Sequence, residues 1–331
     1  MEVLIVNQEE VAKLMPMDAC MDAMAGALKI LSDGNAIMPL RPVLWLPEKA
    51  GALGLMPAIM EDIDSMGIKI VSVMPGNHGT EYDSHQGAVL LFETKNGRML
   101  AMIDASEITA IRTAAASGVA TRLLARAAAD DLAILGSGVQ ARSHLEAMLV
   151  AREIKRVRVW SRTLQNAQAF AEKESQRHGI EIEVPDSAEA AVDGADIICT
   201  TTSAREPILM GDWLAPGAHI NAAGSSVPFT RELDTAAVVK SRLFVDRRES
   251  TLNEAGDFLM PKAEGAIGDD HIRAEIGEII LGNHPGRESS DEITLFKSLG
   301  VAVEDLAAAH LIYNSAIEKG MGTSIEFGGG R

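Results

Sequence analysis

Short hydrophobic runs separated by turn residues dominate the first third of the chain. After an expected strand at 3–6 and an expected helix at 9–32, mainly apolar runs alternate with Pro, Gly and Asn. We expect strands at 43–46, 52–57, 67–74, 88–93 and 98–104. This pattern predicts a β-rich α+β domain with a flanking helix.

From residue 106 onward the pattern changes to helices and strands in alternation. A helix rich in small residues is expected at 106–127, and apolar residues recur at helical spacing at 142–150 and 303–318. Expected strands lie at 131–135, 157–160, 195–200, 219–223 and 243–245. Such alternation predicts a parallel, doubly wound α/β sheet. Nothing fixes the conformation of the tail at 327–331.

A glycine turn follows the first strand of this second region. The sequence Gly-Ser-Gly-Val-Gln-Ala begins at Gly136, directly after the apolar run 131–135, and leads into a helix-forming segment. A strand, a tight glycine turn and a helix N-terminus together seat a dinucleotide pyrophosphate on backbone N–H groups. The spacing predicts a Rossmann nicotinamide site, with Gly136 and Gly138 beside the pyrophosphate.

The next expected strand ends in Ser161, Arg162 and Thr163. NAD-specific sites usually place an acidic residue here, about 20 residues beyond the glycines, where it accepts hydrogen bonds from the ribose. A guanidinium and two hydroxyls instead suit the 2′-phosphate of NADPH, which a carboxylate would repel. We therefore expect a preference for NADPH over NADH. The alternative is that Arg162 is a solvated loop residue.

Composition and charge agree with an enzyme that acts on small molecules. The chain has 331 residues, enough for two domains, and 47 acidic against 30 basic residues give a formal charge of −17. This charge disfavours nucleic acids and anionic membranes as partners.

The N-terminal sequence does not resemble a signal peptide, and we expect a cytoplasmic protein. Cys20 and Cys199 suggest neither a disulfide framework nor a metal site.

Six separated motifs resemble the ornithine cyclodeaminase and mu-crystallin family over almost the whole chain. They are Leu-Met-Pro-Ala at 55–58, Ile-Arg-Thr-Ala-Ala at 111–115, Leu-Gly-Ser-Gly-Val-Gln-Ala at 135–141, Pro-Gly-Ala-His-Ile-Asn at 216–221, Arg-Glu-Leu-Asp at 231–234 and Phe-Lys-Ser-Leu-Gly at 296–300. The motifs are most similar to the NADPH-dependent ketimine reductase and alanine dehydrogenase branches. The resemblance implies a homodimer, with a substrate-binding and dimerisation domain of residues 1–115 and 303–331 and a Rossmann domain of residues 116–302.

The resemblance also assigns a substrate site. Arg41 and Arg112 correspond to the pair that binds the substrate carboxylate, and Lys69 to the lysine beside the reacting carbon and nitrogen. A guanidinium can hold a carboxylate bidentately, and a partly desolvated lysine can protonate an imine nitrogen. Taken alone, the alternation of Lys69 with Ile68 and Ile70 favours a lysine on the surface of a strand.

Further positions carried over from the family complete the expected contacts. His85 and Gln86 match a motif near the substrate and the nicotinamide, although a lone histidine in a loop is more often an ordinary polar residue. The expected cofactor contacts are Arg112, Gly136, Gly138, Val139, Gln140, Ser161, Arg162, Thr163, Asn166, Thr202, Ser203, Ala223, Ser226 and Gly300.

Two departures from the family pattern distinguish among its activities. The deaminating cyclases carry acidic residues where this chain has Gly54 and Ser226, and a serine cannot act as the base that amine loss and ring closure require. We therefore predict an NAD(P)H-dependent oxidoreductase, an imino-acid (ketimine) reductase that acts in reverse as an amino-acid dehydrogenase. Its substrate would be a small α-imino carboxylate such as pyrroline-2-carboxylate, piperideine-2-carboxylate or iminopyruvate.

Two alternatives remain open at this point. One is an ornithine cyclodeaminase, which converts ornithine to proline and ammonia with bound NAD. The other is a non-catalytic protein that uses the dinucleotide fold to hold NADPH or another small ligand. The combination of Lys69 with Arg41 and Arg112 argues against the second alternative.

Overall fold

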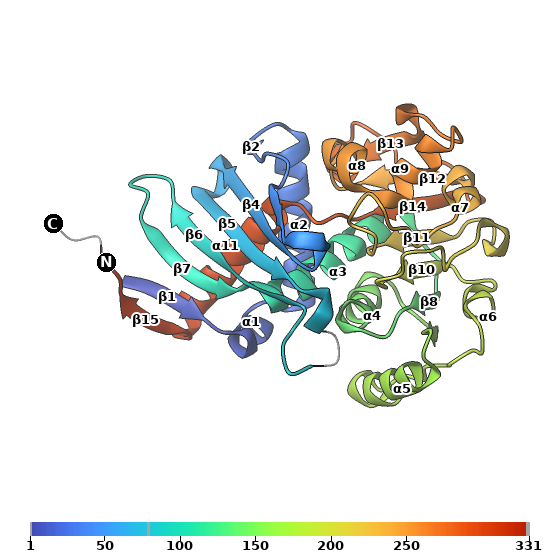
Figure 1. Ribbon diagram of the computed structural model, residues 1–331, viewed down its shortest axis with the longest axis horizontal. Helices are drawn as coiled ribbons and strands as arrows, with labels where there is room; N and C mark the ends of the chain where they lie inside the picture. The colour runs from blue at the N-terminus through green and yellow to red at the C-terminus, as the bar shows by residue number, and fades with distance from the viewer. Residues whose placement is uncertain (1, 78–79, 329–331) are drawn as a thin grey trace. The chain divides into compact units, whose positions relative to one another are not determined.

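The chain folds into two compact units. Figure 1 shows the chain coloured by residue number from the N-terminus to the C-terminus. The computed structural model describes residues 2–77 and 80–328. The first unit is formed by Met1–Arg112 and Val301–Arg331, and the second by Thr113–Gly300. Within the described residues, no helix is long and apolar enough to cross a membrane.

The first unit contains an eight-stranded, mainly antiparallel sheet. Its strands are β1 (Glu2–Val6), β2 (Ala36–Ile37), β3 (Val43–Trp45), β4 (Ala52–Met60), β5 (Ser65–Val73), β6 (His85–Glu93), β7 (Met99–Asp104) and β15 (Thr323–Glu326). The order is β15-β1-β7-β6-β5-β4-β2, and β3 also pairs with β4. The tail expected to be unfixed follows β15, and its residues 329–331 lie outside the described part of the chain.

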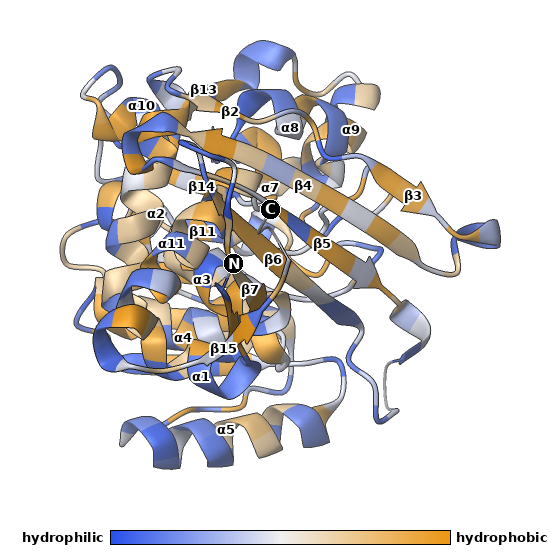
Figure 2. Cartoon of the chain, turned by 90° about the vertical axis from the view of Figure 1, so that its left-hand side faces the viewer, coloured by the Kyte–Doolittle hydropathy of each residue, from blue (hydrophilic) through white to orange (hydrophobic). Residues whose placement is uncertain are grey.

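Helices cover one face of this sheet. The last helix, α11 (Ala302–Lys319), packs on β4, β5 and β6 and against α2 (Met17–Ser32). Alternate residues of β4 and β5 are therefore buried beneath α11, whereas the intervening side chains lie on the opposite face of the sheet. Figure 2 shows long hydrophobic stretches along β5, β6 and β7.

The single helix expected at 9–32 is two helices, and that prediction is wrong. The chain forms α1 (Gln8–Leu14) and then α2, with Pro16 between them. Proline has no N–H to continue the helical hydrogen bonds, and its ring disfavours helical angles at the preceding residue. Met15 accordingly leaves the helical region, with φ −127° and ψ 73°.

The second unit contains a seven-stranded sheet in which every neighbouring pair is parallel. Its strands are β8 (Asp131–Leu135), β9 (Arg156–Trp160), β10 (Ile197–Thr200), β11 (His219–Ala222), β12 (Ser241–Val245), β13 (Ile272–Glu275) and β14 (Ile293–Lys297). The order is β13-β12-β14-β11-β10-β8-β9. Because β9 and β10 lie on opposite sides of β8, a topological switch point falls between β8 and β10, where doubly wound folds bind ligands. The predicted fold class is confirmed.

The first helix of this part of the chain, α3 (Ala105–Leu124), leads from β7 into β8, and the others connect the parallel strands. The others are α4 (Val139–Ala151), α5 (Leu164–His178), α6 (Ala188–Val192), α7 (Thr235–Lys240), α8 (Arg248–Glu254), α9 (Gly256–Ala263) and α10 (Ile276–Ile280). α3 begins in the first unit and ends in the second.

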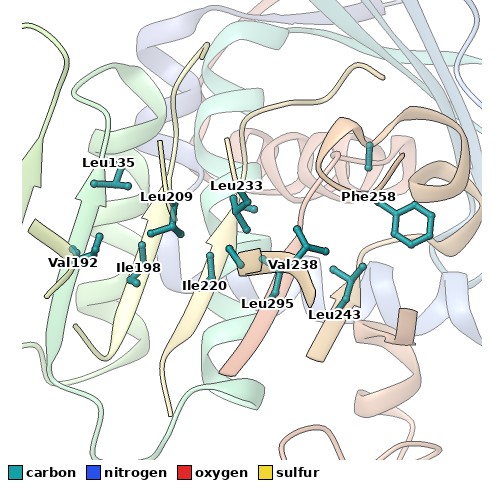
Figure 3. Packing of buried hydrophobic residues seen from close by; sticks show 14 of the residues in the cluster. Leu135, Val192, Ile198, Leu209, Ile220, Leu233, Val238, Leu243, Phe258 and Leu295 are labelled. Atoms are coloured by element: carbon teal, nitrogen blue, oxygen red, sulfur yellow. The ribbon is translucent and has the colours of Figure 1, made fainter. Parts of the chain in front are cut away.

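A hydrophobic core packs against one face of the parallel sheet (Figure 3). Leu135, Ile198 and Ile220 come from β8, β10 and β11, and Val192 and Val238 come from α6 and α7. Each such side chain contributes about 1.5–3 kcal/mol when it is fully removed from water. The packed strands give the loops at their carboxyl ends a rigid base.

Candidate active site

Lys69 is a buried lysine on β5 that an aspartate of α11 holds in place. The side chain is 2% exposed, and its Nζ lies 2.8 Å from Asp305 Oδ1 and 3.4 Å from Thr109 Oγ1. Its cross-strand neighbours are Met56 on β4 and Val89 on β6, both buried. The charged group therefore lies in apolar surroundings with one carboxylate partner.

The alternation along β5, taken alone, predicts that Lys69 lies on the surface, and that prediction is wrong. Ile68 and Ile70 lie on the outer face of the sheet and are only partly buried, whereas Lys69 lies on the face that α11 covers. Side chains of β5 do alternate between the two faces of the sheet, but Ile68 and Ile70 lie on the outer face and not on the face that α11 covers. Desolvation at this position would assist the role that the family resemblance implies, because it lowers the pKa of the amine.

The surroundings of Lys69 lower the pKa of its amine toward neutral pH. The pKa of Lys69 is lowered from 10.5 to about 8, with burial as the largest cause and the charge of Asp305 opposing it. The positive charges of Arg112 and Arg41 act in the same direction as burial and are part of this change in pKa. An amine with a pKa near 8 can both donate and accept a proton under physiological conditions.

Arg112 forms two buried ion pairs with residues at the start of α11. Its Nε donates to Asp305 Oδ1 at 2.9 Å, and its Nη1 donates to Glu304 Oε2 at 2.9 Å. Asp305 Oδ1 thus accepts hydrogen bonds from both Arg112 and Lys69. These contacts fix the orientation of the guanidinium, and they engage two of its nitrogen atoms within the protein.

Glu304 and Asp305 are partners of Lys69 and Arg112 in this candidate site that sequence reasoning misses. They lie in the first turn of α11, where acidic side chains are common because they complement the helix dipole. Both are nevertheless buried, in a helix whose other first residues are apolar. Two adjacent acids within such an apolar helix are the signal that would have identified them, since buried carboxylates require cationic partners.

Arg41 and His85 also lie within electrostatic reach of Lys69. Arg41, between β2 and β3, is close enough for its charge to affect the pKa of Lys69. Limited solvation lowers the pKa of His85, with the charge of Lys69 acting in the same direction and that of Asp83 opposing it. Gln86 instead donates its Nε2–H to the backbone oxygen of Asp83 at 2.9 Å.

The charges of this cluster suit an anionic ligand. Lys69, Arg112 and Arg41 supply three cations against the two carboxylates of Glu304 and Asp305. The balance is one positive charge, in a chain whose overall charge is −17. Asp305 Oδ2 is buried and lacks a hydrogen-bond partner among the described residues, so it offers an acceptor to an N–H group or a water.

The glycine turn after β8 has the geometry that a dinucleotide requires. Gly136 adopts φ +129°, and a Cβ at this position would lie 2.6 Å from Thr201 Oγ1. Gly138 is the N-cap of α4, and Val139 in the first turn is 60% exposed. No N-cap side chain covers this helix terminus, so its N–H groups and positive dipole end fit a pyrophosphate.

The other expected cofactor residues follow strands at the same edge of the parallel sheet. Ser161, Arg162 and Thr163 follow β9, Asn166 lies in the first turn of α5, Thr202 and Ser203 follow β10, Ala223 and Ser226 follow β11, and Gly300 follows β14. Gln140 lies beside Val139 in the first turn of α4. Because parallel strands end at one edge, the fold places these residues along a single side of the sheet. Within the described residues, no group of His, Cys, Asp and Glu side chains is arranged to hold a metal ion.

A doubly wound sheet with a glycine turn defines the second unit as a dinucleotide-binding fold. The first unit adds a buried lysine and arginine that share a carboxylate. The chain belongs to the ornithine cyclodeaminase/mu-crystallin family, whose model matches residues 1–320. The resemblance seen in the sequence is thereby confirmed.

Three relatives are similar to this chain over most of their length. Ketimine reductase mu-crystallin of Mus musculus is 46% identical over 283 residues, which are 86% of each chain. The structure of Thermococcus litoralis Delta(1)-pyrroline-2-carboxylate reductase in complex with NADH and L-proline matches with a TM-score of 0.94 and 41% identity, over 97% of this chain and 99% of that chain. An archaeal alanine dehydrogenase dimer with bound NAD matches with a TM-score of 0.93 and 35% identity, over 99% and 100% of the two chains.

Proposed function

We infer that this protein is an NAD(P)H-dependent imino-acid reductase, an oxidoreductase that acts on CH–NH or CH–NH2 groups. The observation that carries this inference is Lys69, a buried lysine with a pKa of about 8 whose Nζ is held by Asp305. Relatives that are 41% and 46% identical are named Delta(1)-pyrroline-2-carboxylate reductase and ketimine reductase mu-crystallin. The substrate class is a small α-imino carboxylate such as pyrroline-2-carboxylate, piperideine-2-carboxylate or iminopyruvate.

The residues of the first unit account for substrate binding and proton transfer. Arg41 and Arg112 provide the positive charge that holds the substrate carboxylate, and Asp305 keeps both Lys69 and Arg112 in fixed orientations. Protonated Lys69 gives its proton to the imine nitrogen, and neutral Lys69 accepts a proton from the amine in the reverse direction. NAD(P)H, when bound, supplies the hydride that adds to the imine carbon.

The residues of the second unit account for cofactor binding. Gly136, Gly138 and the N-terminus of α4 would hold the pyrophosphate, and Arg162 with its neighbouring hydroxyls would bind the 2′-phosphate of NADPH. We therefore propose that NADPH is preferred and that NADH is also accepted. Residues 116–302 would form the cofactor domain, and residues 1–115 and 303–331 the substrate-binding and dimerisation domain.

The outer face of the first unit's sheet supports a homodimer. The strand register aligns Met102, Leu90, Ile68 and Pro57 in one row across four strands, on the face opposite α11. Met102 is 40% exposed, and a hollow of about 470 Å³ lined by Ile68 and Pro57 lies on this sheet. A second copy would cover this apolar surface.

We place the dimer in the cytoplasm, in agreement with two cysteines that are free thiols.

Rates of NADPH and NADH oxidation with a panel of imino acids test this function. The panel contains pyrroline-2-carboxylate, piperideine-2-carboxylate and pyruvate with ammonia, and ornithine serves as the substrate of the cyclodeaminase alternative. We expect turnover of at least one imine and no release of ammonia from ornithine. Binding of cofactor without turnover of any imine would contradict the proposal.

A further inference from the structure

Glu232 is a buried residue of the second unit whose carboxylate joins two neighbouring loops. The residue is fully buried, and its Oε1 accepts hydrogen bonds from the backbone N–H and the hydroxyl of Thr202, each at 2.6 Å. Its Oε2 accepts the N–H of Gly224 at 3.0 Å. Thr202 follows β10 and Gly224 follows β11, so one side chain ties together the carboxyl ends of two adjacent strands.

Gly224 shows how closely Glu232 approaches the loop after β11. A Cβ on Gly224 would lie 2.4 Å from the carboxylate carbon of Glu232, so the contact requires glycine. The next residue, Ser225, adopts φ +57°, and its hydroxyl donates to Thr230 Oγ1 at 3.1 Å. A left-handed serine costs energy and persists only where its surroundings enforce it.

A second carboxylate, Asp257, holds the segment that carries Glu232. Its Oδ1 accepts the backbone N–H groups of Glu232 at 2.8 Å and Leu233 at 3.1 Å. Its Oδ2 lies 3.0 Å from the Nζ of Lys297, which also donates to the backbone oxygen of Gly224. The Arg-Glu-Leu-Asp and Phe-Lys-Ser-Leu-Gly motifs thus meet in one buried ionic network.

A third carboxylate, Asp246, extends this arrangement to the loop that follows β14. Asp246 follows β12, and its Oδ2 accepts the N–H groups of Leu299 at 2.6 Å and Gly300 at 2.8 Å. Hydrogen bonds to buried carboxylates therefore hold the loops that follow β10, β11, β12 and β14. Buried ion networks are a weak source of stability compared with apolar packing, so their concentration at the ligand-binding edge points to a role in that site.

We propose that Glu232 is a positioning residue for NAD(P)H, which fixes the loops after β10 and β11 before the cofactor binds. The expected contacts Thr202, Ser203, Ala223 and Ser226 all lie on these two loops. Loops that are already ordered lose less conformational entropy when a ligand binds, which raises its affinity. The inference rests on the proposed function for the identity of the cofactor.

The substitution Glu232→Gln tests this role. Glutamine keeps the size of the side chain, but its NH2 group would face either the Gly224 N–H or the Thr202 donors. We expect the dissociation constants of NADPH and NADH, measured by cofactor fluorescence without any imine substrate, to rise roughly tenfold to a hundredfold. Gly224→Ala displaces the same carboxylate and should weaken binding in the same way.

Asp196→Asn provides a matched control at the opposite edge of the same sheet. Asp196 precedes β10, its Oδ2 accepts the N–H groups of Asp130 at 3.0 Å and Asp131 at 3.3 Å, and its other oxygen pairs with Arg126. This variant should lower the melting temperature and leave cofactor affinity within about twofold. A Glu232→Gln variant that loses thermal stability but keeps wild-type cofactor affinity would overturn the proposal.

Hydrogen exchange of the cofactor-free wild type tests the proposal without any variant. The amides of Thr202 and Gly224 should exchange as slowly as those of the neighbouring strands, and rapid exchange would contradict a preformed site. Both measurements are independent of turnover. If the wild type binds cofactor but reduces no imine, the proposed function fails while the role of Glu232 is still decided by the affinities.

Discussion

Lys69 is suited to proton transfer because two opposing influences act on its amine. Burial between Met56 and Val89 disfavours the charged form, and Asp305 partly restores it, which leaves a pKa of about 8. Full burial without Asp305 would hold the amine neutral at physiological pH, and full exposure would hold it charged. The ion pair therefore adjusts the proton affinity of Lys69 as well as its position.

The pH dependence of the two reaction directions should differ in sign. Imine reduction requires protonated Lys69, so kcat/KM should fall as the pH rises through about 8. Amine oxidation requires neutral Lys69, so its kcat/KM should rise through the same pH. Steady-state rates in both directions with a single imine and amine pair check this expectation. Profiles that change in the same sense in both directions would exclude Lys69 as the group that transfers the proton.

The variant Asp305→Asn should move the reduction profile toward lower pH. Removal of the negative charge leaves burial and the neighbouring cations to lower the pKa of Lys69 further, by roughly 1–3 pH units. Rates at low and high pH measure the displacement, with exposed Asp62→Asn as the control that should leave the profile unchanged. An Asp305→Asn enzyme with the wild-type profile would contradict the role assigned to this carboxylate.

At the scale of elements, the local β8, glycine turn and α4 unit is predictable from sequence because its signals are adjacent. The same holds for most strands of both sheets. The strands β2, β13, β14 and β15 escape prediction, since pairing with distant segments decides whether they form. The pairing of Lys69 with Asp305 is equally hidden because 236 positions separate the two residues, and only the tertiary fold brings α11 onto β5.

Arg162, in the loop between β9 and α5, should determine the preference between the two cofactors. We expect Arg162→Ala to raise the KM for NADPH roughly tenfold to a hundredfold, because a charge-assisted contact to the 2′-phosphate is lost. The KM for NADH should change little. Arg177→Ala, at the other end of α5 and exposed, is the matched control. Equal KM changes for the two cofactors would show that Arg162 does not contact the phosphate.

At the scale of the whole molecule, the first unit is completed by the end of the chain. After the second unit closes at Gly300, α11 returns to cover β4, β5 and β6 and supplies Glu304 and Asp305. The sheet is consequently buried on one face and apolar on the other. Alternation within single strands cannot show which face a helix covers, so alternation places Lys69 on the surface, and only the role implied by the family resemblance favours a desolvated lysine.

The outer face of this sheet should form the contact between two copies. Met102→Glu places a charge among the apolar residues of β5, β6 and β7, so the variant should elute as a monomer where the wild type elutes as a dimer. Light scattering coupled to size-exclusion chromatography measures the mass. Leu164→Glu, at an exposed apolar position on α5, should remain dimeric. A dimeric Met102→Glu variant would place the contact elsewhere.

Transfer of deuterium from NADPH labelled at the transferable C4 position tests the central claim most directly. The protein is incubated with labelled NADPH and pyrroline-2-carboxylate, and the proline formed is analysed by mass spectrometry and NMR. Direct hydride transfer to the C=N carbon predicts proline that carries deuterium at its α-carbon, with one cofactor oxidised for each proline formed. Unlabelled proline, or no cofactor oxidation with any imine of the panel, would contradict the assignment of this protein as an imino-acid reductase.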